Sequence, residues 1–322
     1  MPYVAPVVAR AEACAVKLES TYGTDPVPTA ASNSVRLARR AWSSITPGYE
    51  WPNLRDEVMN NSFIPLVSAL PAGLKCRVNL GWELKGLGAD YTSSSVFVDA
   101  DPLFQSCGWS GSYSTSPSHR WTYAPITPAT LRPSCSIYVW AGGNQYKVSG
   151  CRGNFEVIFR AGQIILVTFM LEGLLTTYPA AAGVPTPTFT GGIPPAAISQ
   201  VMSIGPWAAD YDEVVLRSGN RTQWLYSGNA ASGLQSYDFG LMMPEIVVTA
   251  RSTPQSTYDP ILDWGAATTR AFTIAWGATQ FNQGTATDPA IFIPSDPGHE
   301  VQKDFTGWRA AYRCTAPSLL FN

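Results

Sequence analysis

The chain has 322 residues, enough for two domains or for one large β domain. Charged residues make up 14% of it, well below the ~25% typical of soluble domains, whereas hydrophobic residues reach 45%. This balance favours a subunit that buries much of its surface against other protein. A net charge of −2 without blocks of like charge argues against a nucleic-acid-binding surface, which would be basic.

The six cysteines and two histidines limit the chemistry that we expect. No two cysteines form a CxxC pair, so a zinc site is not expected. The positions of Cys135 and Cys151 are compatible with neighbouring strands, and the thiols are interpreted as buried and unpaired. The first twenty residues lack the basic start and uninterrupted apolar core of a signal peptide, so secretion is not expected.

In chain order, the first half alternates strand candidates with proline-rich connections. The clearest strand is the one in which Val78, Leu80 and Trp82 alternate with Arg77 and Asn79. The connection after the first strand is long, and long connections in compact domains are usually functional. Strands are expected at 34–42, 75–86 and 134–141, and loops are expected at 22–33, 46–74 and 110–133.

One good helix is predicted at 98–108, VDADPLFQSCG. Asp99 or Asp101 is the expected N-cap. Pro102 suits the first turn, and Gly108 suits a left-handed end. Its apolar stripe consists of Leu103, Phe104 and Cys107.

A long hairpin at 146–175 is the most distinctive stretch of the chain. Alternation of period two places Phe155, Val157 and Phe159 on one face of its first arm. The turn falls at 161–163, where Gly162 supplies a positive φ. The opposite face carries Asn154, Glu156, Ile158 and Arg160. A two-stranded ribbon is not stable alone in water, so the apolar face needs a cover and the edges need partners.

Residues 179–195 are rich in Pro, Gly, Ala and Thr and predict a semi-rigid linker. We therefore expect one β domain over 1–178 and a second, similar one over 196–322. The second half is expected to begin with a long loop over 205–243 and to contain a short helix at 257–267. Its strands are expected at 244–251, 271–277, 290–294 and 308–316.

Two short sequences recur at nearly the same spacing, which predicts an internal duplication. The pattern Trp-x4-Asp-Glu-Val at 51–58 returns 156 residues later at 207–214. Asp101-Pro102-Leu103 returns 158 residues later as Asp-Pro-Ile at 259–261. The expected fold class is therefore mainly β, with each half a β-sandwich or half-barrel that carries a short flanking helix.

No catalytic or cofactor motif is present in the sequence. It lacks a G-x-S-x-G elbow, an HExxH pair and a Walker loop, so we expect neither an enzyme nor a cofactor. His119 and His299 have no motif around them. The tryptophans are interpreted as core and interface residues, with a sugar-binding platform as the less favoured alternative.

Three motifs lie in order along the first half: KLESTYGTDP at 17–26, DPLFQSCG at 101–108 and GCRGNFEVIFRAG at 150–162. In sequence and spacing, over about residues 10–190, they resemble the major tail tube proteins of long-tailed bacteriophages. Ser20 and Phe104 depart from the commoner residues of that family. None of these motifs is catalytic, and beyond the linker the resemblance is one of length and layout only.

The resemblance implies a virion tail protein, assembled in the host cytoplasm, whose rings stack into a tube around a channel for double-stranded DNA. The partners would be other copies of the chain and other tail proteins at the tube ends, with no membrane and no sequence-specific DNA binding. Two similar halves fit a trimer that imitates six-fold symmetry better than a hexamer. The sequence also predicts that strand edges are removed by ring closure.

Within this interpretation, Asn154, Glu156 and Arg160 are candidates for lining the channel, since few free cations would avoid trapping phosphates. The candidate ring-to-ring contacts lie in the two long loops, at Trp51, Asp56, Glu57, Trp207, Asp212 and Glu213. Alternatives are a tail terminator or decoration protein of the virion and, less favoured, a secreted glycan-binding β-sandwich protein.

Overall fold

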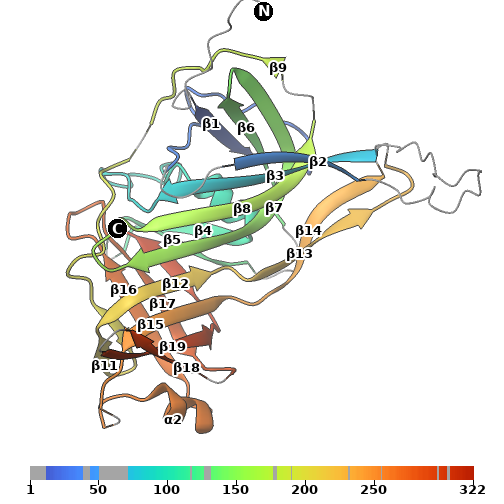
Figure 1. Ribbon diagram of the computed structural model, residues 1–322. Helices are drawn as coiled ribbons and strands as arrows, with labels where there is room; N and C mark the ends of the chain where they lie inside the picture. Colours follow the sequence, from blue (N-terminus) through green and yellow to red (C-terminus); the bar gives the residue numbers. More distant parts are fainter. Residues whose placement is uncertain are drawn as a thin grey trace, which may run out of the picture.

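A computed structural model of the protein describes residues 12–38, 44–50, 72–116, 118–126, 132–176, 180–189, 191–230, 233–254, 256–295, 297–302 and 305–322 (Figure 1). The fold is mainly β, as predicted: antiparallel sheets and two short helices. Buried side chains of both sheets meet in one hydrophobic core.

The larger sheet contains eight strands in one continuous path, with three more attached at its side. The path runs β18 (Gly298–Gln302), β19 (Phe305–Arg313), β15 (Glu245–Arg251), β12 (Tyr211–Arg217), β7 (Asn144–Arg160), β8 (Leu166–Leu175), β3 (Ala72–Glu83) and β2 (Ser44–Glu50). β6 (Cys135–Ala141) and β9 (Ala180–Ala181) pair with β7, and β1 (Ala13–Leu18) pairs with β6. Every pair is antiparallel.

The second sheet has seven strands and packs against the larger one through the core. Its order is β11 (Trp207–Ala209), β10 (Met202–Ile204), β16 (Arg270–Trp276), β17 (Gly284–Ile291), β20 (Ser318–Phe321), β5 (Arg120–Pro125) and β4 (Trp109–Ser114). A separate hairpin consists of β13 (Asn220–Tyr226) and β14 (Leu234–Met242). The helices are α1 (Asp101–Ser106) and α2 (Pro260–Gly265).

The two halves of the chain have the same arrangement in the larger sheet. In chain order, the first half contributes β2, β3, β7 and β8 and the second contributes β12, β15, β18 and β19. In both halves the first strand pairs with the second, the second with the fourth, and the fourth with the third. A short helix follows the second strand in each half, and a hairpin of the second sheet follows the helix.

This strand order supports one of the two recurring sequences and not the other. The Asp-Pro-Leu and Asp-Pro-Ile sequences lie at the equivalent helices α1 and α2. The strand equivalent to β12 is β2, which ends at Glu50, before Trp51. Pairing 51–58 with 207–214 therefore does not match the strand order, and residues 51–58 lie outside the described part of the chain.

Both sheets continue across the predicted linker. β7 of the first half pairs with β12 of the second, and β20 of the second half pairs with β5 of the first. Phe104 of α1 packs against Phe321 of β20, with ring centroids 6.4 Å apart. The halves at 1–178 and 196–322 thus share one core instead of enclosing two.

The hairpin β7–β8 forms as predicted and lies at the centre of the larger sheet. Phe155, Val157 and Phe159 are fully buried, and Gly162 has a φ of 75° in the turn. Side chains from both halves of the chain cover the apolar face of this hairpin. Phe104 of α1 lies 5.2 Å from Phe155, and Trp276 of β16 lies 5.9 Å from Phe159, measured between ring centroids.

Helix α1 confirms the predicted helix but begins later and lacks the predicted cap. Its N-cap is Ala100, without a side-chain hydrogen bond. Asp99 instead accepts a hydrogen bond from Trp82 Nε1 at 2.8 Å, close to the buried Lys85. Gly108 ends the helix with a φ of 76°, as predicted. In α2, Asp259 is the N-cap and accepts from the Ile261 amide.

Several sequence predictions of loops and strands are wrong. The segment 110–133 contains β4 and β5, and the ends of 46–74 form parts of β2 and β3. The segment 205–243 is not a loop, because most of it is in β11, β12, β13 and β14. Residues 34–38 form only isolated bridges, at Ser34 and Leu37. The many Ser, Gly and Pro residues of 109–125 favour a loop prediction, although Trp121 and Tyr123 alternate with Arg120 and Thr122 as in a strand.

The cysteine predictions are confirmed. All six thiols are buried and unpaired, and Cys135 lies opposite Cys151 on the neighbouring strands β6 and β7. The tryptophans also lie mainly in the core: Trp82, Trp109, Trp276 and Trp308 are at most 2% exposed.

Asp101 is a buried carboxyl in the first turn of α1. It accepts hydrogen bonds from Tyr123 Oη and Gln105 Nε2, each at 2.8 Å. Burial nevertheless raises the pKa of this carboxyl to about 6, because desolvation outweighs the two hydrogen bonds. Between about pH 4 and pH 6, Asp101 is therefore protonated in the folded chain but ionised in the unfolded chain, where its pKa is about 3.9.

The stability that this proton confers is complete below about pH 4 and is lost as the pH rises through the folded pKa. We expect Asp101→Asn to remove this dependence. Between about pH 4.5 and pH 7.5, the free energy of unfolding of the wild type should fall relative to the variant by on the order of 1–3 kcal/mol. Urea unfolding at both pH values measures the difference, and equal pH dependence of the two proteins would contradict it.

Candidate functional site

The candidate site is the polar face of the larger sheet, which we define as the side chains of β3, β8, β7, β12, β15 and β19 that point away from the second sheet. Asn154, Glu156 and Arg160 all lie on this face, opposite the buried Phe155, Val157 and Phe159. The second sheet covers the other face, so the polar face is the open side of the sandwich (Figure 1).

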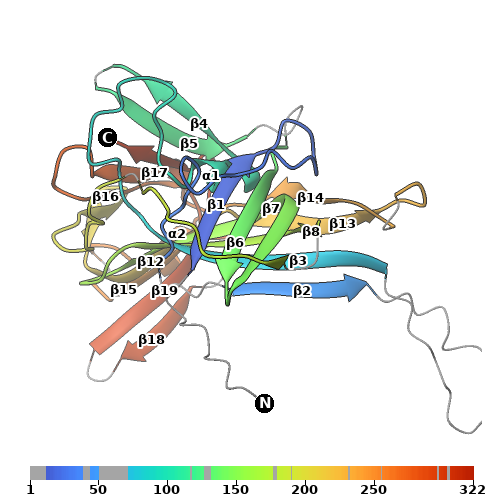
Figure 2. The same cartoon turned by 90° about the horizontal axis from the view of Figure 1, so that it is seen from above.

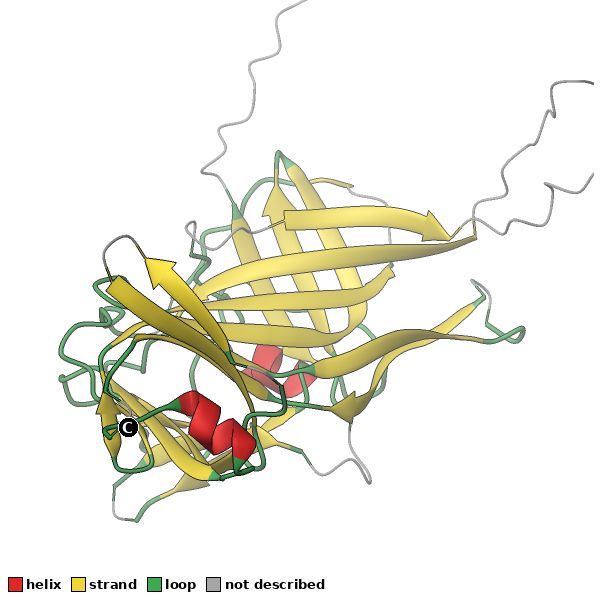
Figure 3. Cartoon of the chain, turned by 60° about the horizontal axis from the view of Figure 1, so that its bottom comes forward, coloured by secondary structure: helices red, strands yellow, loops and turns green. Residues whose placement is uncertain are grey.

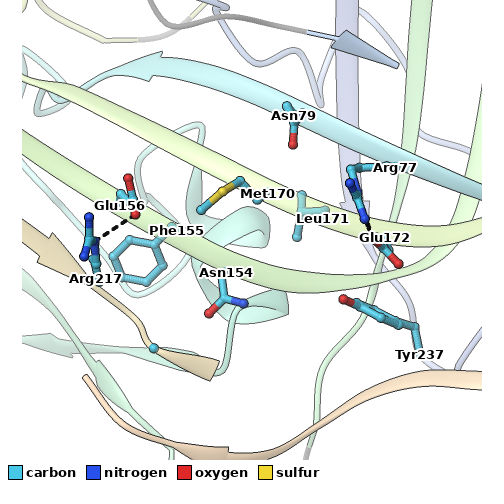
Figure 4. Close-up of a pocket in the computed structure, with 11 residues that line it drawn as sticks. Arg77, Asn79, Asn154, Phe155, Glu156, Met170, Leu171, Glu172, Arg217 and Tyr237 are labelled. Atoms are coloured by element: carbon cyan, nitrogen blue, oxygen red, sulfur yellow. Dashed lines mark hydrogen bonds and ion pairs between the residues drawn. The ribbon is translucent and has the colours of Figure 1, made fainter. Parts of the chain in front are cut away.

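Lateral pairing arranges the polar face in rows that cross the strands. One row alternates in charge through Glu156, Arg217, Glu245 and Arg313, on β7, β12, β15 and β19. Arg217 donates to Glu156 Oε1 at 2.9 Å (Figure 4). It also donates to Glu245 Oε2 at 3.3 Å, so one guanidinium is held between two carboxylates.

Two other arginines of this face each pair with one carboxylate. Arg77 on β3 donates to Glu172 on β8 at 2.8 and 2.6 Å. Arg160 on β7 donates from Nε to Glu213 on β12 at 2.7 Å. Exposed pairs of this kind contribute only about 0–1 kcal/mol each to stability. Their main physical effect is to offset each arginine charge at short range.

An apolar row separates two of these charged rows and explains the position of Ile158. The paired residues are Leu166, Ile158, Val215, Val247 and Ala311. Val215 and Val247 are 7% and 5% exposed, although they lie on the polar face. The long side chains of the adjacent charged rows shield them, as the stems of arginine and glutamate commonly do.

A hollow of about 420 Å³ lies on the polar face where the hairpin β13–β14 approaches β3, β7 and β8. Tyr237 of β14 lines it together with Arg77, Glu172 and Met170 (Figure 4). Trp224 of β13 donates to Glu172 at 2.9 Å and so ties the hairpin to the sheet. The charged side chains that line the hollow form ion pairs with one another, Arg77 with Glu172 and Arg217 with Glu156.

Asn154 was predicted to line a channel, but its side chain is used within the chain. Its Nδ2 donates to the Asn220 carbonyl at 3.0 Å, and its Oδ1 accepts from Ser218 Oγ and the Asn220 amide. Asn220 then donates to the carbonyls of Cys107 and Gly153, each at 2.7 Å. These bonds clamp the start of the hairpin β13–β14 to α1 and β7.

The predicted ring-to-ring residues do not lie together in a loop. Trp207 is in β11, 5% exposed, and stacks on Tyr258 with ring centroids 4.4 Å apart. Asp212 and Glu213 are in β12, where Glu213 holds Arg160. A buried tryptophan and a paired glutamate within a sheet are not a contact loop. Trp51, Asp56 and Glu57 lie outside the described residues.

Sequence reasoning missed Arg77, Glu172, Arg217 and Glu245, which complete the charged rows. Each is a charged residue at the alternate, non-core position of a strand. That alternation was visible in the sequence, but the partner of each charge depends on the register between strands.

The motifs at 17–26 and 150–162 meet at one structural junction. Glu19 accepts hydrogen bonds from the amides of Gly23 and Gly150, each at 2.7 Å. The Tyr22 ring lies 4.6 Å from the guanidinium carbon of the buried Arg152, and its hydroxyl accepts from the Tyr237 amide. Gly150 has a φ of 65°, and any Cβ there would lie 2.7 Å from the Tyr22 ring. These motif residues therefore join the first half to β14 of the second.

Both ends of the eight-strand path are open. Within the described part of the chain, β2 pairs only with β3, and β18 pairs only with β19. Seven antiparallel steps separate them, so β2 and β18 run in opposite directions. The edge strands of one copy are thus suited to antiparallel pairing with those of another.

A scan against protein-family models and a search of curated proteins found no match for this chain. Neither helix in the described ranges is long and apolar enough to cross a membrane. Among the same residues, no group of three or more His, Cys, Asp or Glu side chains is placed to hold a metal ion.

Proposed function

We propose that the protein is the structural subunit of a phage tail tube, whose copies join into stacked rings around a channel for DNA. One observation carries the proposal: the strand order is the same in the two halves, and the halves join edge to edge at β7 and β12. The open edges β18 and β2 are the equivalents of β7 and β12. A second copy can therefore extend the sheet with the junction that already exists inside the chain.

Repeating this junction closes a ring, because twisted sheets curl and closure removes the remaining edges. Each copy contributes two similar halves, so a ring of three copies has six similar units and pseudo-six-fold symmetry. Since the second sheet covers one face, the polar face is the one that lines the channel.

The hairpin β13–β14 supplies the contact between rings in this proposal. It extends beyond the sheet on the same side as the adjacent ends of β2 and β3 (Figure 2). Tyr226, near the turn of this hairpin, is 59% exposed. Other tail proteins would bind the two ends of the tube, and the assembled protein would reside in the virion tail after assembly in the host cytoplasm.

The paired charges suit the passage of DNA without capture. Phosphate binding grows with each free Lys or Arg contact, and on the polar face carboxylates hold Arg77, Arg160 and Arg217. Among the described residues of the same face, the exposed Arg251 and Arg309 are not in such an ion pair. The proposed role is passive, without catalysis or a cofactor.

Removing the carboxylates around Arg217 should therefore create DNA binding. We expect the double variant Glu156→Gln, Glu245→Gln, in unassembled form, to bind a short DNA duplex more tightly than the wild type at low salt. The slope of log affinity against log salt should become steeper by about one unit, the value for one added phosphate contact. Adding Arg217→Gln should restore wild-type binding, and an unchanged slope in the double variant would contradict the prediction.

Negative-stain microscopy of the purified protein over a range of salt and protein concentrations tests the proposed function. Rings of three copies and stacks of such rings are the expected result. Only monomers under all conditions would overturn the tube, and rings of six copies would overturn the pseudo-six-fold trimer.

A further inference from the structure

Helix α2 presents large apolar side chains to the surface of the isolated chain. Ile261, Leu262 and Trp264 are 38%, 52% and 41% exposed, although α2 is only six residues long. The helix is held in this orientation, because Arg270 donates to both carboxylate oxygens of Asp263, at 3.0 and 2.7 Å. We propose that this apolar face packs against the neighbouring copy of the chain that pairs along β18.

In the equivalent helix of the first half, α1, the corresponding apolar side chains are buried. Leu103 and Phe104 of α1 correspond to Ile261 and Leu262, and both are fully buried. Part of their cover comes from β1 and β6, and among the described residues the second half has no strands in the corresponding places. The two helices follow the equivalent strands β3 and β15, but the apolar side chains of α1 are buried, whereas those of α2 are exposed. Figure 3 shows α2 in front, at the outside of the chain.

The rest of the cover on α1 comes from across the junction between the halves. Asn220, three residues beyond the end of β12, donates to the Cys107 carbonyl at the end of α1. Phe239 and Met242 of β14 approach Gly108, and Phe321 of β20 packs on Phe104. Residues of the second half therefore complete the cover of α1, which the first half covers only in part.

Helix α2 is connected to the strand next to the open edge β18. Tyr258, just before α2, bonds Tyr312 at 2.8 Å and lies 5.8 Å from Trp308, both on β19. β19 is the immediate neighbour of the edge strand β18. A copy that pairs along β18 therefore reaches α2 as the second half reaches α1. This inference rests on the proposed ring and identifies a contact within it.

Leu262→Asp tests the contact, with Ile193→Asp as the matched control. Ile193 is 84% exposed and lies in the connection between the halves. Both variants should unfold like the wild type when unassembled, because each changes an exposed side chain. We expect Leu262→Asp to raise the protein concentration needed for ring formation at least about tenfold, which corresponds to about 1.4 kcal/mol, and Ile193→Asp to leave it unchanged.

A photoreactive benzoylphenylalanine at position 262 gives a second measurement that does not depend on stability. In wild-type rings it should form covalent links between copies, and the same group at position 193 should not. Normal ring formation by Leu262→Asp, or links only within one chain while rings form, would overturn this inference and leave the proposed function intact. A wild-type chain that never forms rings would overturn both.

Discussion

A chain carrying Ser44→Cys and Glu300→Cys should form a covalently closed ring under mild oxidation. On a denaturing gel, the products should end at a band of three times the mass of one chain, because closure of a ring of three leaves no free end. The six native thiols are buried and should not contribute in the folded protein. Incomplete oxidation should leave linear dimers and trimers, and no product should exceed three chain masses.

The choice of positions follows from the junction inside the chain. We match the ends of β3 and β15 and the ends of β7 and β18, and keep the observed pairing registers. Gly298 then takes the place of Glu156, and Thr46 takes the place of Arg217. Glu156 lies opposite Arg217 in β7 and β12, so Gly298 should lie opposite Thr46 in the next copy. Two residues further along, the antiparallel register brings the two substituted positions together.

A second pair of substitutions, Gly48→Cys with Glu300→Cys, is the matched control. The same register separates these positions by four residues, roughly 13 Å along a strand, which is beyond the reach of a disulfide. We expect little covalent product from this pair. Equal crosslinking of both pairs would point to random collision, and a limiting band at six chain masses would replace the trimer with a hexamer.

Phe104→Ala should cost about 3–5 kcal/mol of unfolding free energy, a large part of the ~5–15 kcal/mol available to most proteins. Phe104 is fully buried, with the rings of Phe155 and Phe169 at 5.2 and 5.1 Å and that of Tyr123 at 5.0 Å. It joins α1 to both sheets and to both halves. Truncation would leave a cavity that these rigid rings cannot close.

Leu262→Ala is the matched control for this prediction, because Leu262 occupies the equivalent position of α2. At 52% exposure, its truncation should change the stability of the unassembled chain by less than about 0.5 kcal/mol. Equilibrium urea unfolding below the concentration of ring formation measures both variants. Similar losses in the two variants would show that the two helices do not differ in burial as the structure indicates.

The elements that the sequence predicted well are those whose pattern is local. The hairpin β7–β8 has strict alternation around Phe155, Val157 and Phe159 and a glycine in its turn. Helix α1 has a proline in its first turn and a glycine at its end. In both cases a single stretch of chain contains all the information that the backbone needs.

The elements that it missed depend on distant partners. β5 is held in its sheet by β20, about 200 residues further along the chain, and its alternating pattern covers only residues 120–123. The polar hairpin β13–β14 is fixed by Trp224 on Glu172 and by Tyr237 on Tyr22. Such contacts can be expected only once the fold is known, because propensity in strands depends on what they pack against.

The candidate site also has a part that local pattern predicts and a part that depends on distant partners. The face that carries Glu156 and Arg160 followed from alternation alone. The partners of these residues did not, because Arg217 and Glu213 reach them only through the register between β7 and β12. The same register places Ile158 beside Val215, which turns an apparent exception into part of an apolar row.

The position of β20 has a consequence for the order of events during synthesis. This four-residue strand lies between β17 and β5, so the second sheet remains in two pieces until the ribosome has passed residue 321. Its Phe321 also completes the packing around Phe104 and Tyr123. A nascent or truncated chain therefore lacks the finished core that holds the edge strands in place. In the proposed assembly, only chains translated through β20 would have the completed core that supports the edge strands joining neighbouring copies.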